Sequence, residues 1–313
     1  MKKIISLIVS FSLLAFIYWK IDFRGLLPLF QNCNFFWMVT SLSLVIPLTL
    51  FTAWRFKIMT PVTAALTLKD ATQLTLAASV LNLVLPSKMG DLAKAYFLKD
   101  RGHLKGSLAF CLVVFEKACD MLSLLIWCIL GLLLYPKKDF VFVIMLILIA
   151  GSTFIGIGIL SFKNWATFFF NFISKFRLKK LTDKIENLKI SWEEMHHFFW
   201  QDLSRLLLVI FSSLFLWFLH LLQIWLFILA LRAWVPFLTN LALSPLAILA
   251  GLFPLTFAGV GTRDGALIYF YQPYFNAHTA AALGLLCTAR YLLPAIGGLP
   301  FFTKYFYQLK FKK

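Results

Sequence analysis

Apolar segments of roughly the twenty residues needed to cross a bilayer recur along most of this chain. Of its 313 residues, 61% are hydrophobic and only 14% are charged, whereas a soluble globular domain has about 25% charged residues. No part of the sequence has the composition of a soluble domain. The sequence therefore predicts an all-α integral membrane protein, folded as a single polytopic domain over residues 1–313.

Six segments are predicted to cross the membrane as full helices. The first resembles a secretory signal, with a basic head and an apolar body, but no small-residue cleavage site follows it. We therefore interpret it as a retained membrane span. The predicted crossings cover about residues 4–19, 35–54, 107–135, 140–162, 204–231 and 279–302.

Two further apolar segments, 71–85 and 238–256, lead into stretches that do not fit a plain membrane helix. LNLVLPSKMGD (81–91) places Pro86 and Gly90 before the acidic Asp91. LFPLTFAGVGTRDG (252–265) repeats this order with Pro254, Gly259, Gly261, Arg263 and Asp264. Proline removes a backbone donor and glycine weakens a helix, so both stretches predict helices broken inside the membrane.

The distribution of basic residues predicts how these segments are oriented. If both short segments enter and leave on the same side, all but eight of the 30 Lys and Arg residues lie in cytoplasmic segments, together with both termini. If 71–85 crossed instead, the basic segments 88–105 and 163–205 would face outside, against the positive-inside rule. We therefore expect six crossings plus two re-entrant hairpins that enter from opposite sides. This is an inverted repeat with halves at about 1–135 and 139–313. The alternative is two ordinary short helices with loops.

The formal net charge of +17 is explained by this topology and by anionic lipids at the cytoplasmic leaflet, without nucleic acid as a partner. The basic, aromatic segment 163–203 fits helices lying on that leaflet and fits a solvated helical hairpin equally well. The strong lysine asymmetry and the absence of an N-x-S/T sequence favour a bacterial inner membrane.

Ionisable residues near the start of the 107–135 segment are candidates for a binding site, because charge at membrane depth usually faces a cavity or a partner. Glu116 and Asp120 share one helix face, while the adjacent Lys117 points elsewhere. We expect Lys88 or Lys94 to be the basic partner of Glu116. Two interpretations stay open, a site for a headgroup or a proton and a structural ion pair.

Arginines in the second half suggest phosphate recognition. Arg263 precedes Asp264 at the end of the second broken helix, and a guanidinium fork binds phosphate bidentately. Backbone amides around Gly259 and Gly261 can add donors. Arg290, inside the last span, fits a phosphate contact or a cap on carbonyl groups of the broken helix.

The cysteines, the histidines and the GVG sequence indicate no catalytic or cofactor site. The five cysteines form no CxxC pair and are interpreted as small hydrophobic residues. His196, His197, His220 and Gln223 receive no role, and no metal or cofactor is expected. The GVG sequence follows no predicted strand, which excludes a dinucleotide site.

Four motifs in order resemble the flippase-like family named for the transmembrane region of lysylphosphatidylglycerol synthase. They are LNLVLPSKMGDLAKAYFLKDRG, FEKACD, FAGVGTRDGAL and ARYLLPAIGG, and the similarity runs from about Phe35 to the end. Lys117 stands where arginine is usual, and Asp264 stands where glutamate is usual. The resemblance implies a membrane protein that moves, or helps to move, a lipid with a polar headgroup. The synthase domain of the namesake is absent from this sequence, so aminoacyl transfer is not expected.

We therefore expect a lipid translocase for a phospholipid or a polyprenyl-phosphate-linked lipid, and not an enzyme. The expected substrate-binding residues are Lys88, Asp91, Lys94, Glu116, Asp120, Arg263, Asp264 and Arg290. The alternative is a non-transporting accessory subunit of a lipid-modifying enzyme or a glycosyltransferase. A membrane-embedded enzyme would need a nucleophile or a metal that the sequence does not supply. A homo-oligomer is compatible with each of these functions.

Overall fold

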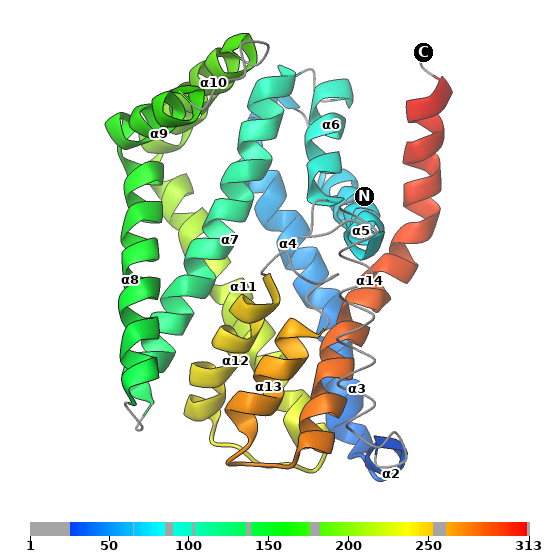
Figure 1. Ribbon diagram of the computed structural model, residues 1–313. Helices are drawn as coiled ribbons and strands as arrows, with labels where there is room; N and C mark the ends of the chain where they lie inside the picture. The colour runs from blue at the N-terminus through cyan, green and yellow to red at the C-terminus, as the bar shows by residue number, and fades with distance from the viewer. Residues whose placement is uncertain are drawn as a thin grey trace.

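The computed structural model of this protein describes residues 26–64, 66–84, 90–101, 104–135, 139–175, 182–252 and 261–311, and its regular elements there are helices (Figure 1). The helices are α2 (Leu26–Gln31), α3 (Phe35–Ser43), α4 (Val45–Met59), the 3-10 turn η2 (Val62–Ala64), α5 (Leu68–Val84), α6 (Leu92–Arg101), α7 (Gly106–Leu134), α8 (Phe140–Ser161), α9 (Lys163–Lys175), α10 (Thr182–Gln201), α11 (Leu203–Ala230), α12 (Phe237–Leu252), α13 (Thr262–Tyr271) and α14 (Ala277–Phe311).

Five helical segments among the described residues are long and apolar enough to cross a membrane. They are Phe35–Met59, Gly106–Leu134, Phe140–Ser161, Leu203–Ala230 and Ala277–Phe302. They coincide with the last five predicted crossings, so the all-α membrane architecture is confirmed. The first predicted crossing, residues 4–19, lies outside the described residues.

Proline shapes two of these spans. The first described span is divided into α3 and α4 at Leu44, three residues before Pro47. Pro47 has no amide hydrogen to donate to the carbonyl of Ser43, so the helical ladder is interrupted there. α14 contains Pro294 and Pro300, and Figure 1 shows it changing direction part way along.

Both predicted broken helices correspond to a pair of short helices. α5 is followed by α6, and α12 by α13, which packs against it. At about 1.5 Å rise per residue, the 16 residues of α12 and the 10 residues of α13 are each too short to cross a hydrocarbon core of about 30 Å. Pro86, Lys88, Pro254 and Gly259 lie outside the described residues. The re-entrant hairpins and the inverted repeat stay predictions.

The ends of the helices are segregated in space. Figure 1 shows α9, α10, the start of α7 and the C-terminal end of α14 at one end of the molecule. The start of α8 and the turn between α13 and α14 lie at the opposite end. α10 is packed on α7, because Phe199 is fully buried and its ring stacks on that of Phe115 with 4.5 Å between centroids. In α9, the neighbouring segment of the predicted 163–203 region, Trp165 and Phe168 are exposed.

Candidate functional site

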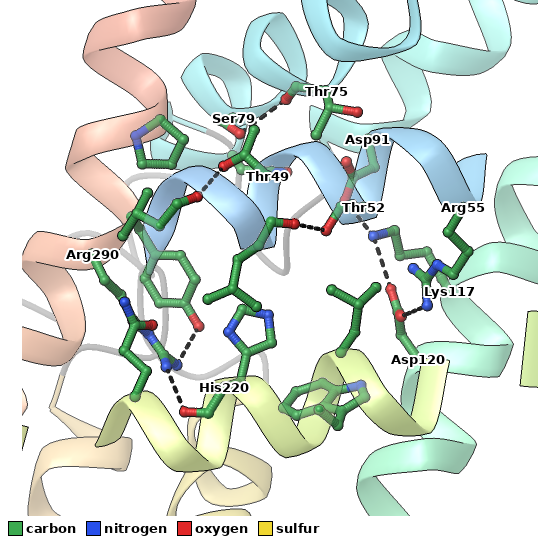
Figure 2. Close-up of a pocket in the computed structure, with 18 of the residues that line it drawn as sticks. Thr49, Thr52, Arg55, Thr75, Ser79, Asp91, Lys117, Asp120, His220 and Arg290 are labelled. Atoms are coloured by element: carbon green, nitrogen blue, oxygen red, sulfur yellow. Dashed lines mark hydrogen bonds and ion pairs between the residues drawn. The ribbon is translucent and has the colours of Figure 1, made fainter. Parts of the chain in front are cut away.

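A cavity of about 190 Å³ lies between α4, α5, α6, α7, α11 and α14. It is far larger than the roughly 10–15 Å³ that one water needs. It is smaller than the roughly 300 Å³ at which pockets for drug-sized ligands begin. The cavity therefore has room for a polar headgroup, and not for a whole lipid. Figure 2 shows Arg290 at one end, Arg55, Lys117 and Asp120 at the other, and Thr49 and Thr52 between them.

At the end of the cavity opposite Arg290, six charged side chains form one network. Lys94 of α6 lies 3.0 Å from Glu116 Oε1 and 3.4 Å from Asp91 Oδ1. Lys117 Nζ lies 2.6 Å from Asp91 Oδ2 and 3.4 Å from Asp120 Oδ2. Arg55 of α4 reaches Asp120 Oδ1 at 2.6 Å and Glu116 Oε1 at 3.5 Å. Three acids and three bases are thereby matched, and the network itself is neutral.

The network has a buried half and a half that faces the cavity. The side chains of Arg55, Lys94 and Glu116 are at most 1% exposed, whereas that of Lys117 is 38% exposed. Removing one partner of a fully buried ion pair costs about 3–5 kcal/mol, because the other charge is left unpaired in a poorly polar interior. The buried half thus fixes α4, α6 and α7 relative to one another. Lys117, and to a lesser extent Asp120 with a side chain 23% exposed, remain accessible to a ligand.

The pairing follows from helix geometry. Glu116 and Asp120, four residues apart, both face Arg55, while Lys117 turns to Asp91. As the sequence predicts, the partner of Glu116 is one of the two candidate lysines, Lys94. Gly90 makes the approach of this segment to α5 sterically feasible. A Cβ atom there would lie 2.5 Å from the backbone nitrogen of Asn82.

Arg290 occupies the other end of the cavity. Its Nη2 donates to the hydroxyl of Tyr291 at 2.9 Å, and its Nη1 lies 3.4 Å from the carbonyl oxygen of His220. The residue is only 3% exposed, and its Nε is buried without a hydrogen-bond partner. Among the described residues no carboxylate pairs with it. The carbonyl that it contacts belongs to α11 and not to a broken helix.

Uncharged polar side chains connect the two ends. The hydroxyls of Thr49 and Thr52 on α4 donate to the carbonyl oxygens one turn earlier, at 2.7 Å each, and keep acceptor capacity. Thr75 and Ser79 line the facing wall on α5. These residues recur every three or four positions, so each set falls on one helix face. The cavity therefore has a polar lining between Arg290 at one end and the charge-matched network at the other.

Arg263 and Asp264 lie away from this cavity, at the start of α13. The Arg263 guanidinium donates to Asp264 Oδ1 through Nε at 3.0 Å and through Nη2 at 2.7 Å. The same Nη2 donates to Gly284 O and Thr288 Oγ1 on α14. Both side chains are almost fully buried. The pair ties α13 to α14, and the Nε and Nη2 donors of Arg263 are engaged within the protein, so the geometry does not favour the phosphate contact expected for Arg263.

Gly261 has a structural role next to Arg263 and Asp264. Its φ of 99° lies in the left-handed region, where a residue with a Cβ is strained. Its amide donates to Asp264 Oδ2 at 3.1 Å, which caps the start of α13. That amide is thus engaged within the protein.

Several residues of the cavity are absent from the sequence prediction. Arg55 is not among the substrate-binding residues expected from the sequence, and His220 and Gln223 receive no role there. The sequence does contain a signal for Arg55, because Thr49, Thr52 and Arg55 are spaced three apart along one apolar helix. His196 and His197 of α10 do not line the cavity: His196 Nε2 lies 3.0 Å from Ser161 O on α8, and His197 Nε2 lies 3.1 Å from Gln201 Nε2. In the described part of the chain, no three His, Cys, Asp or Glu side chains form a group that could hold a metal ion.

The fold and the cavity define a multi-pass helical membrane protein with a chamber of about 190 Å³, lined by charged and polar side chains, between its helices. Its sequence matches the family described as lysylphosphatidylglycerol synthase TM region over residues 3–298. The chain belongs to that family, which confirms the resemblance seen in its four motifs. It is also similar to the UPF0104 membrane protein MJ1595 of Methanocaldococcus jannaschii. The two are 26% identical over 313 residues, which cover 95% of this chain and 93% of the relative.

Proposed function

We propose that this protein is a lipid translocase that binds a phosphate-bearing headgroup in the cavity and moves the lipid between leaflets. The observation that carries the proposal is Arg290. A buried guanidinium is costly unless a charge compensates it, and the described neighbours of Arg290 are neutral. A phosphate is the anion that a membrane lipid offers at this position, and its geometry fits a guanidinium fork.

The size of the cavity supports a lipid as the ligand. The headgroup would enter the chamber between α4, α5, α11 and α14, while the acyl or polyprenyl chains stay in the bilayer. Lys117, 38% exposed at the far end, is the second cation available to the headgroup. The carboxylates of Asp91 and Asp120 would restrain Lys117 in the absence of ligand.

Movement would come from the two predicted halves. In transporters with inverted repeats, broken helices flank a central site and one half rocks against the other. Here α5 and α6 pack near the ion network, and α12 and α13 belong to the second half. The proposed orientation places both chain termini in the cytoplasm of a bacterial inner membrane. α9 and α10 would then lie at its anionic leaflet.

A transfer assay tests this function. The purified protein is reconstituted in vesicles, and the movement of a fluorescent phospholipid between leaflets is followed for the wild type and for Arg290→Gln. We expect transfer to fall at least about tenfold in the variant, because the anion loses a buried charge-assisted contact. Arg232→Gln, which removes an exposed arginine at the end of α11, is the matched control and keeps the wild-type rate.

The same assay separates the accessory-subunit alternative. Equal transfer by the wild type, Arg290→Gln and protein-free vesicles would overturn translocation. Arg290-dependent lipid binding without any transfer, together with a stoichiometric enzyme that copurifies, would favour the accessory subunit. Product formed by the pure protein would instead establish an enzyme.

A further inference from the structure

Three oxygen atoms on the cavity wall lack hydrogen-bond partners; two are amide oxygens, which need donors, and the third is a hydroxyl, which can accept or donate. Thr75 Oγ1, Asn82 Oδ1 and Gln223 Oε1 are buried without a hydrogen-bond partner in the described part of the chain, and all three residues line the cavity. Thr75 is 8% exposed and Gln223 is fully buried. An unsatisfied buried polar atom is costly, so such atoms indicate a bound group or water that the protein alone does not provide.

The orientation of Gln223 identifies what is missing. Its Nε2 donates to the carbonyl oxygen of Ser41 at 2.8 Å. This bond fixes which end of the amide remains free, and that end is the acceptor oxygen. An amide oxygen accepts only. A ligand that satisfies it must donate hydrogen bonds, as hydroxyl or ammonium groups do.

The charges of the cavity distinguish these two donors. Asp91 already has two basic partners, Lys94 and Lys117, and Asp120 also has two, Arg55 and Lys117. An ammonium group would therefore find no uncompensated carboxylate among them. It would also share a small chamber with Lys117 and Arg290. Neutral hydroxyl groups satisfy the oxygen atoms without this repulsion.

We propose that the ligand is a lipid phosphodiester whose headgroup is a neutral polyol, a glycerol or a sugar, and that it is not an amine. This inference rests on the proposed function, since Arg290 holds the phosphate. Thr75, Asn82 and Gln223 then accept hydrogen bonds from the polyol. An aminoacylated headgroup is disfavoured for the same reason, because its added ammonium groups face Arg290 and Lys117.

Binding of three lipids with identical acyl chains tests the inference. Phosphatidylglycerol offers a phosphate and hydroxyl groups, phosphatidylethanolamine a phosphate and an ammonium group, and phosphatidic acid a phosphate alone. Affinity for each is measured by native mass spectrometry of the whole protein. We expect phosphatidylglycerol to bind about tenfold more tightly than either of the others, the range that one or two hydrogen bonds provide.

Two variants separate the polyol from the phosphate. Thr75→Val keeps the shape of the side chain and removes its oxygen, so it lowers the affinity for phosphatidylglycerol several-fold and leaves phosphatidic acid unchanged. Arg290→Gln lowers the affinity for all three lipids. If Arg290→Gln weakens binding but phosphatidylglycerol shows no advantage, the polyol inference is overturned and phosphate binding stands. If Thr75→Val weakens phosphatidylglycerol and phosphatidic acid equally, the polyol inference also fails. If Arg290→Gln changes the affinity for none of the lipids, the proposed function and the polyol inference both fail.

Discussion

Arg55 Nη1 lies 2.6 Å from Asp120 Oδ1 and joins α4 to α7 at the edge of the cavity. The same nitrogen donates to Ser213 Oγ on α11 at 2.7 Å. One side chain thus links three membrane helices. It also contacts Glu116 Oε1 at 3.5 Å and so joins Asp120 to the buried pair of Lys94 and Glu116.

The buried pair is predicted to dominate the stability of this region. Glu116→Gln removes the nearer of the two carboxylate partners of Lys94 and one of the two partners of Arg55, which leaves excess positive charge in a buried network, and we expect a loss of about 3–5 kcal/mol. Thermal unfolding of the purified protein in detergent should show a fall of several degrees. The matched control is Glu194→Gln, whose exposed carboxylate lies 3.9 Å from Lys105 and contributes little. Equal melting temperatures for the two variants would contradict the structural role of Glu116.

Two adjacent glycines in α14 are predicted to respond in opposite ways. A Cβ at Gly298 would lie 2.1 Å from the backbone oxygen of Leu76 on α5, whereas one at Gly297 meets only a side-chain carbon at 3.9 Å. Gly298→Ala should force α14 from α5 and destabilise the protein by about 1–3 kcal/mol or more. Gly297→Ala should be neutral or slightly stabilising, because alanine favours a helix. Thermal unfolding compares them, and a reversed order would show that α5 and α14 are not packed this closely.

Arg263 is predicted to act in folding and not in lipid binding. Arg263→Gln loses the bonds to Asp264 and to Thr288 that hold α13 against α14, so its melting temperature should fall. The fraction that remains folded should bind lipid as the wild type does, by native mass spectrometry. A variant with an unchanged melting temperature and no bound lipid would restore Arg263 as a ligand residue.

The orientation in the membrane is predicted from the segregation of basic residues. Glu193 on α10 and Gln272 directly after α13 are both exposed, and Figure 1 shows α10 and the turn between α13 and α14 at opposite ends of the molecule. In intact cells, a membrane-impermeant maleimide should label Gln272→Cys and not Glu193→Cys. The five native cysteines, four of them buried, are controlled for by the wild type. The opposite labelling pattern would invert the topology.

The sequence predicts the helices well because each apolar span is a local property. The described spans agree with five predicted crossings. Glu116, Lys94 and Asp91 also stand out, since charged residues in an apolar context are rare. Among the described residues, α13 begins directly after Gly261, one of the predicted helix breakers. These features depend on neighbours in the chain.

The assignment of roles could not be predicted in the same way, because it depends on which helices face each other. Arg55 ends a span in an aromatic and basic border, a pattern also typical of the membrane interface. Only the packing of α4 against α7 and α11 buries Arg55 and brings it into contact with both helices. Arg263 and Arg290 are both arginines in apolar surroundings. Arg263 forms an ion pair with the neighbouring Asp264, whereas the described surroundings of Arg290 are neutral.

The most direct test of the central claim is native mass spectrometry of the protein in gentle detergent, with identification of the bound lipid, for the wild type, Arg290→Gln and Arg232→Gln. The account predicts one phosphate-containing lipid class on the wild type and on Arg232→Gln, and its loss from Arg290→Gln. A mixed lipid shell that is the same in all three proteins would contradict it and would make the charges of the cavity purely structural.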